Sequence, residues 1–200
     1  MANNNATNGN SYGYIAGGYP ENVTGTTVTR IDYASDTSTS SPKGTISESK
    51  YFVSGTGNID YGYLGGGREQ HDPGQSDFSS TSKIERIDFS NDTAIASRRA
   101  DMATARTESS ATSNLQNGLP QGFPQGTVGT YGAGYWGAGG NPSQSEFSTV
   151  GRLDFANDTV KTLTRGPLNI TAMEIAATSS TSHGYFAGGE PSSPSPGTTH

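Results

Sequence analysis

The sequence has no cysteine, so neither a disulfide nor a thiolate metal site can hold this 200-residue chain together. Basic residues are few, with 12 Lys and Arg against 18 Asp and Glu, and the net charge of −6 argues against nucleic-acid binding. No apolar run approaches the ~20 residues of a membrane helix, and the segment 1–11 lacks the apolar core of a secretory signal. We therefore expect a protein with no membrane insertion and no signal peptide.

Helical periodicity is also missing. Only 30% of the residues are hydrophobic by side chain, a figure that includes 10 tyrosines; 28 glycines add to them, and Ser, Thr and Asn fill much of the rest. This mixture favours short strands and turns over helices. The best helix candidate by propensity is the segment 98–110, yet in repeat register it covers a turn and the start of a strand. We predict no helix there.

A short glycine-terminated word recurs four times. It reads GYIAGG from Gly13, GYLGGG from Gly62, GYWGAGG from Gly134 and GYFAGG from Gly184. The last glycines of the four words are spaced by 49, 73 and 49 residues, and the agreement of two intervals indicates a repeat. The doublets suit places where a side chain would clash or where φ must be positive. These repeat-structural glycines are Gly17, Gly18, Gly66, Gly67, Gly139, Gly140, Gly188 and Gly189.

A second word follows each of the first three glycine words. It reads RIDY from Arg30, RIDF from Arg86 and RLDF from Arg152. The next residues, ASDT, SNDT or ANDT, are turn chemistry, because Asp and Asn bond their own backbone. With a weak third segment and a fourth such as KYFVSG, each unit holds four candidate strands. Four short strands in a period of 49 residues are typical of a propeller blade, kelch-like by length.

The predicted fold is therefore all-β, with blades of four antiparallel strands in three complete repeats plus one strand of a fourth. We expect the glycine word to form a strand near the propeller axis. Its bulky residues should fill the space between blades: Ile15, Leu64, Trp136 and Phe186. The predicted divisions are a polar segment 1–11, a repeat domain 12–189 and a Pro/Ser-rich end 190–200. Within the domain the repeats cover 12–61, 62–133 and 134–183, and a fourth starts at 184–189.

The order of these words resembles the kelch repeat. That family has a glycine doublet and a Met-Pro-x-x-Arg-like turn, to which DMATAR, Asp101 to Arg106, is similar. GYFAGG, RIDFSNDT, RGPL and AATSS are also similar to repeats of marine cyanophage virion proteins, tail or fibre components. The resemblance covers the chain from about Tyr12 to Gly189. The third-strand tryptophan of kelch is missing, and Trp136 stands in the glycine word instead. The resemblance implies a propeller in a virion, although the fold alone fixes no function.

Two sets of charges recur in register: Arg30, Arg86 and Arg152, and Asp32, Asp88 and Asp154. One interpretation is a charged ring around a channel that binds an ion or an anionic sugar. We favour a hydrogen-bonded Arg–Asp contact between strands or blades, since a residue in every blade serves what all blades share. His71, His183 and His200 show no metal-ligand spacing. We expect no catalytic residues, no metal and no cofactor.

The middle repeat carries insertions of 7 and 17 residues, within the segments 68–83 and 114–134. The second is rich in Gly, Pro and Gln, and its apolar and aromatic residues are candidates for binding a partner or a glycan: Leu119, Phe123 and Tyr131. Such side chains on a loop of a rigid scaffold suit a protein or a sugar. A tolerated surface insertion is the alternative.

The sequence predicts a non-enzymatic virion component that mediates assembly with other virion proteins or attachment to a host-surface glycan or protein. The alternatives are a carbohydrate-active enzyme or lectin on a propeller, and a trimeric β-fibre. The chain stops in mid-repeat. We expect a longer polypeptide to close the propeller; the alternative is that several chains, as a homo- or hetero-oligomer, complete each other's sheets.

Overall fold

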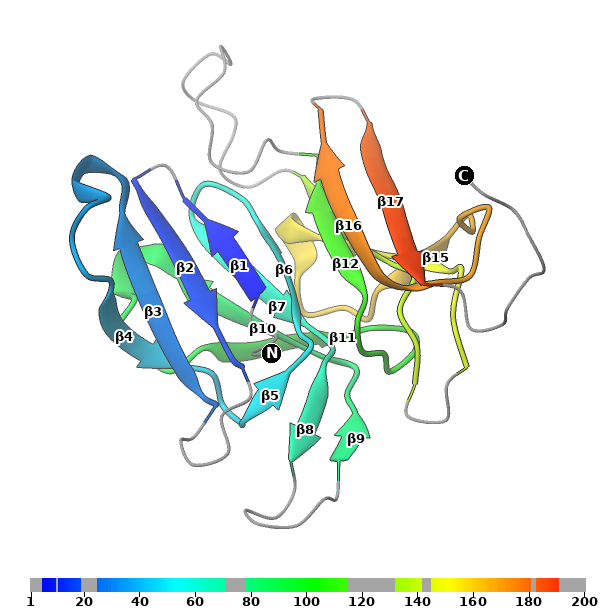
Figure 1. Cartoon of the computed structure of the whole chain (residues 1–200), viewed down its shortest axis with the longest axis horizontal. Coiled ribbons are helices and arrows are strands. Elements are labelled where there is room, and N and C mark those ends of the chain that lie inside the picture. The colour runs from blue at the N-terminus through cyan, green and yellow to red at the C-terminus, as the bar shows by residue number, and fades with distance from the viewer. Residues whose placement is uncertain are drawn as a thin grey trace.

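The computed structural model describes residues 5–9, 11–18, 25–70, 78–114, 132–141, 145–180 and 183–190. This part of the chain contains antiparallel strands and three short 3-10 turns and no α-helix (Figure 1). The prediction of an all-β fold is confirmed. The segment 98–110 is a strand end, an irregular connection and a strand start, so the repeat register outweighed helix propensity there.

Three sheets have four strands each, and a fourth has two. Sheet 1 contains β1 (Asn5–Asn8), β2 (Tyr12–Ala16), β3 (Thr27–Asp32) and β4 (Ser41–Thr45) in that order. Sheet 2 contains β6 (Ser54–Gly57), β7 (Tyr61–Gly65), β10 (Lys83–Asp88) and β11 (Ser97–Asp101). Sheet 3 contains β12 (Ser110–Ser113), β13 (Ala133–Gly137), β14 (Val150–Asp154) and β15 (Leu163–Arg165). Sheet 4 contains β16 (Met173–Ser179) and β17 (Gly184–Glu190).

The glycine word is the second strand of each of these four sheets, and the expectation that it lies near a propeller axis stays a prediction. The first strands β1, β6, β12 and β16 contact one another in succession and follow one another across Figure 1. Each sheet therefore begins one strand before the repeat that the sequence delineates. The physical reason is the short turn after β1, β6 and β16, which pairs each of them with the following glycine word as a hairpin. The strand β12 pairs with its glycine word in the same way, although the second insertion lies between them.

The glycine doublets make room for a crossing backbone. Gly66 has a φ of +70°, and a Cβ added there would lie 2.6 Å from the carbonyl oxygen of Arg106. The next glycine, Gly67, donates its N–H to the same carbonyl at 2.9 Å. Gly17 meets the carbonyl of Lys50 in the same way, at 2.7 Å. In both cases the carbonyl belongs to the segment that leads into the next sheet, so the doublet lets consecutive sheets approach.

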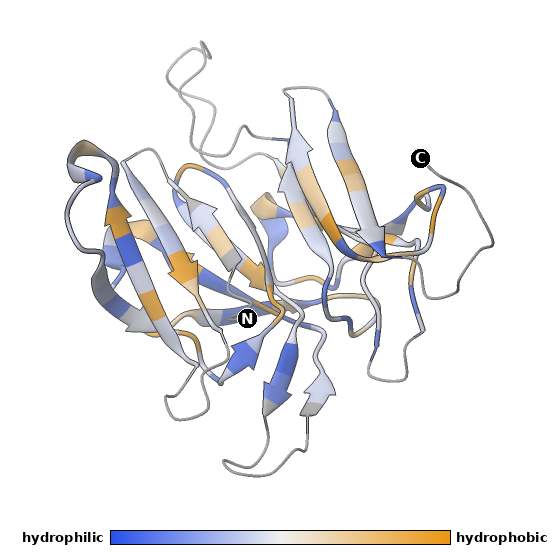
Figure 2. Cartoon of the chain, viewed as in Figure 1, coloured by the Kyte–Doolittle hydropathy of each residue, from blue (hydrophilic) through white to orange (hydrophobic). Residues whose placement is uncertain are grey.

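The cores lie between neighbouring sheets. Leu64 of sheet 2 packs with Tyr14 and Val28 of sheet 1, and Trp136 of sheet 3 packs with the buried residues of sheet 2. Phe186 of sheet 4 packs against a smaller cluster around Ala138. Figure 2 shows the corresponding apolar positions along the strands, interrupted by hydrophilic ones. Each bulky residue of the glycine word thus faces the preceding sheet, and Ile15, in sheet 1, is only half-buried.

A small side sheet of β5 (Lys50–Tyr51), β8 (Arg68–Gln70) and β9 (Phe78–Ser80) projects beside sheet 2 (Figure 1). Its strands β8 and β9 lie in the segment 68–83 that carries the first insertion. The buried ammonium of Lys50 bonds the carboxylate of Glu85 and lies 3.3 Å from Glu69. Lys83 bonds the other oxygen of Glu69 at 3.0 Å. These alternating charges fix the side sheet to sheet 2, and no ion in the network lacks an opposite neighbour.

Candidate functional site

A 3-10 turn follows the third strand of each complete sheet: Tyr33–Ser35, Phe89–Asn91 and Phe155–Asn157. The aspartate of the RID word caps each turn; Asp88, for example, accepts the backbone N–H of Ser90 at 2.9 Å. A 3-10 helix has three residues per turn, so residues i and i+3 lie on the same side. Each turn therefore presents an aromatic ring and, three residues later, a carboxylate, to the preceding sheet.

Between sheets 1 and 2 these two groups meet a tyrosine and an arginine. The ring of Tyr14 stacks on Phe89 with centroids 4.7 Å apart and planes 8° from parallel. Its hydroxyl donates to Asp92 Oδ2 at 3.1 Å, and Arg30 Nη1 donates to the same oxygen at 2.7 Å. The guanidinium of Arg30 lies over the ring of Tyr12, 4.0 Å from its centroid. Burial, together with the Asp92 charge, raises the pKa of Tyr14 to about 12.

The same arrangement recurs between sheets 2 and 3. Tyr63 stacks on Phe155 with centroids 4.7 Å apart, and its hydroxyl donates to Asp158 Oδ2 at 3.0 Å. Arg86 Nη1 donates to that oxygen at 2.8 Å. Arg99 adds a two-pronged contact, with Nε and Nη2 at 2.9 and 2.7 Å from Asp158 Oδ1. The Asp158 side chain is only 5% exposed. Burial alone would raise its pKa, but the hydrogen bonds from Arg99 and Tyr63 lower it below the usual value.

We call these two groups of residues the interface clusters. In each interface cluster the carboxylate that bonds the arginine belongs to the aspartate of the NDT word. The aspartates of the RID word were the partners predicted from the sequence. Two of the recurring arginines, Arg30 and Arg86, bridge sheets. The three aspartates of the RID word instead cap the 3-10 turns: Asp32, Asp88 and Asp154. The NDT aspartates recur as regularly, and the sequence interpretation assigned them to turn chemistry alone. Spatial proximity across 62 or 72 residues was the information that the spacing did not contain.

Arg106 of the DMATAR segment also joins two sheets. Its buried guanidinium donates to the carbonyls of Ala138 and Thr149 at 2.9 Å each, and to the Thr149 hydroxyl at 2.9 Å. Burial lowers its pKa to about 10. No carboxylate pairs with it among the described residues, so backbone dipoles carry the interaction.

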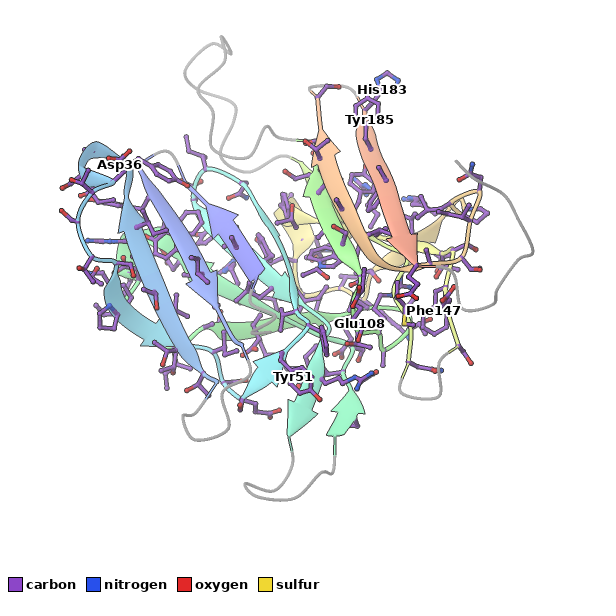
Figure 3. All side chains as sticks on the ribbon, viewed as in Figure 1. Asp36, Tyr51, Glu108, Phe147, His183 and Tyr185 are labelled. Carbon is purple, nitrogen blue, oxygen red and sulfur yellow. The ribbon has the colours of Figure 1, made fainter. Side chains whose placement is uncertain are left out.

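Sheet 1 presents one half of an interface cluster to solvent. Tyr33 and Asp36 correspond to Phe89 and Asp92, yet Tyr33 is 48% exposed and Asp36 has neither a hydrogen bond nor an ion pair among the described residues. Figure 3 shows Asp36 at the left of the view, and His183 and Tyr185 at the upper end of the β16–β17 hairpin. Among the described residues, no preceding sheet supplies a tyrosine and an arginine to Tyr33 and Asp36.

Sheet 3 presents the other half. Tyr135 and Arg152 correspond to Tyr63 and Arg86, but within the described ranges the Tyr135 hydroxyl has no acceptor. Arg152 makes only a 3.8 Å ion pair with Asp154 of its own strand. A pocket of about 240 Å³ adjoins Tyr135, lined also by Thr112, Ser113, Asn114, His183 and Gly184. The first glycine of the next doublet is open as well, because a Cβ at Gly188 would meet no atom within 4 Å.

The histidines and the apolar residues of the second insertion are the remaining candidates from the sequence. His183 is exposed at the start of β17, with its ring 6.3 Å from that of Tyr185. Leu119, Phe123 and Tyr131 lie outside the described residues, as do His71 and His200. In the described part of the chain no three His, Asp or Glu side chains are grouped as a metal site would require. A search of the same part found no helix with the length and apolarity needed to cross a membrane.

No protein-family model matches the chain, and no curated protein is significantly similar to it in sequence. We therefore infer the function from the interface clusters and their two open halves.

Proposed function

We propose that the chain is a non-enzymatic structural or binding component of a phage virion, and that its sheets are blades of a propeller-like ring. It would act in a tail, a fibre or on the particle surface, where it joins other virion proteins or a host-surface molecule. The observation that carries this proposal is the pair of open half-clusters. Sheet 1 exposes an aromatic ring and a carboxylate, and sheet 3 carries a tyrosine and an arginine of the types that bind such a pair in the complete clusters.

The two complete clusters support the proposal because they use the same four residue types in the same geometry. A contact whose halves lie on opposite faces of each unit is heterologous, and such contacts continue until they close or are capped. Each of sheets 1 to 3 also takes all four strands from consecutive parts of one chain. This favours stacked blades over an interwoven trimeric fibre.

The test is the composition of purified particles. Peptides of this chain, quantified by mass spectrometry, should accompany density-banded virions at a fixed ratio to the major capsid protein. Recovery of the chain only from the soluble lysate would overturn the virion assignment. Binding of the fluorescently labelled chain to host cells then separates attachment from assembly, since an assembly component should not label intact cells.

A further inference from the structure

The pocket beside Tyr135 lies where two complete interfaces hold an aromatic ring. Phe89 sits against Gly9 of sheet 1 and Gly62 of its own sheet, and it stacks on Tyr14. In strand register the equivalents are Asn114, Gly184 and Tyr135, and all three line the pocket. A Cβ at Gly184 would meet only Thr112 within 4 Å, whereas one at Gly62 would also meet Phe89. In the part of the chain that the structure describes, the pocket therefore occupies the position that Phe89 fills in the first interface cluster.

The polar side of the pocket indicates the second group of its ligand. In the complete clusters a tyrosine hydroxyl and an arginine of one sheet share a carboxylate of the next. Tyr135 and Arg152 hold these two donors in the same register, and Arg152 is 27% exposed. A carboxylate three residues after the aromatic ring would reach both, as in the 3-10 turns of sheets 2 and 3.

The outer edge of β17 indicates how the ligand is held. In sheets 1 and 2 the glycine-word strand pairs on both edges, but among the described residues the glycine-word strand of sheet 4, β17, pairs with β16 alone. His183 stands where Tyr12 and Tyr61 each lie under the guanidinium of an arginine on the third strand. An added strand would thus bring its own arginine over His183, and main-chain hydrogen bonds along β17 would supply affinity.

We propose that the β17 edge and the adjoining pocket bind a strand followed by a turn, with the sequence Arg-(Ile/Leu)-Asp-(Phe/Tyr)-x-x-Asp. This rests on the proposed function, since it treats the sheets as members of one repeating array. The occupant is a repeat segment free to add to an edge. A rigid second copy does not fit, because its β3 already pairs on one edge with β2 and on the other with β4.

The probe is a labelled peptide with the sequence of residues 83–101, KIERIDFSNDTAIASRRAD, titrated into the full chain and followed by fluorescence anisotropy. We expect saturable binding that a scrambled peptide does not show. Replacing the peptide phenylalanine by Ala, or its second aspartate (of SNDT) by Asn, should weaken binding at least about tenfold. In the chain, Arg152→Gln should weaken it similarly, and Arg165→Gln, an exposed control on the same sheet, should not.

Three outcomes would overturn the inference. The native peptide does not bind to a chain whose folding is verified by the emission of buried Trp136, or it binds as well without its phenylalanine and aspartate. Alternatively, sedimentation shows that the chain self-associates, and Tyr33→Ala abolishes this, so that a second copy is the occupant. None of these results bears on whether the chain is recovered from virions, and that recovery tests the proposed function separately.

Discussion

Asp158 offers the sharpest test of the interface clusters, because the chain holds three equivalent aspartates in graded surroundings. Asp158 accepts hydrogen bonds from two arginines and one tyrosine, whereas Asp92 accepts from one arginine and one tyrosine. Asp36 has no partner among the described residues. Replacing each by Asn keeps the shape and removes the charge, so the three variants form an internal series.

The expected magnitudes follow from these contacts. A hydrogen bond to a charged group contributes roughly 1.5–3 kcal/mol, and removing one partner of a buried ion pair costs roughly 3–5 kcal/mol. The arginines around Asp158 remain 21% and 28% exposed, so water replaces part of what is lost. We expect Asp158→Asn to lower the free energy of unfolding by about 3–4 kcal/mol and Asp92→Asn by about 2 kcal/mol. Asp36→Asn should change it by less than about 0.5 kcal/mol.

The measurement is urea unfolding followed by the emission of Trp136, which is fully buried between sheets 2 and 3. The pKa of Asp158 is lowered in the folded protein, so its contribution is present above the unfolded-state pKa of about 3.9 and is lost as the pH falls through the lower folded value. The gap between wild type and Asp158→Asn should therefore be complete at neutral pH and close in acid. Equal losses for Asp158→Asn and Asp36→Asn, or a gap that persists in acid, would refute the reasoning.

Three further predictions use the same unfolding assay. Tyr63→Phe should cost about 1–1.5 kcal/mol because its buried hydroxyl donates to a carboxylate, and Tyr135→Phe should cost less than about 0.5 kcal/mol; equal costs would contradict the open half-cluster. Gly66→Ala should cost more than about 2 kcal/mol because of its positive φ and the nearby carbonyl, whereas Gly166→Ala, with no atom within 4 Å, should not destabilise; the reverse order would disprove the crossing-backbone argument. Lys50→Met should cost about 3–5 kcal/mol by leaving two buried glutamates without their shared cation, and a loss below about 1 kcal/mol would show that they protonate instead.

The repeat spacing was sufficient to predict most strands of the repeats, but not β1 in the polar segment 1–11, nor the grouping of the strands into sheets. A repeat length does not determine at which strand each sheet begins, so the same words are compatible with a sheet that starts at the glycine word or one strand earlier. The missing information was in the connections. Only three residues separate β6 from β7, which is a hairpin length, whereas eight residues separate β11 from β12. Hairpin lengths would have placed β1, β6 and β16 first in their sheets, and the period would then have placed β12 first as well.

The sequence predicted one half of each interface cluster and not the other. The recurring arginines were identified, and a contact between units was expected of them. Their partners, Asp92 and Asp158, were hidden because a turn aspartate has a sufficient local explanation in its own backbone. The RID aspartate, which seemed the natural ion partner, is the one with the local role as a cap. Spacing identifies recurring residues, but only the packing of neighbouring sheets distinguishes a cap from a bridge.

The placement of the two halves of each cluster has a consequence for assembly. Sheet 2 carries its aromatic ring and carboxylate toward sheet 1 and its tyrosine and arginine toward sheet 3, so it cannot form a cluster within itself. An open array of units built like sheet 2 leaves one carboxylate and one arginine outside a complete cluster, as Asp36 and Arg152 are among the described residues. The first strands follow one another side by side, which makes closure around a common line the geometry that removes both ends at once. The interface clusters would then serve as the closing contact of the ring as well as its repeating one.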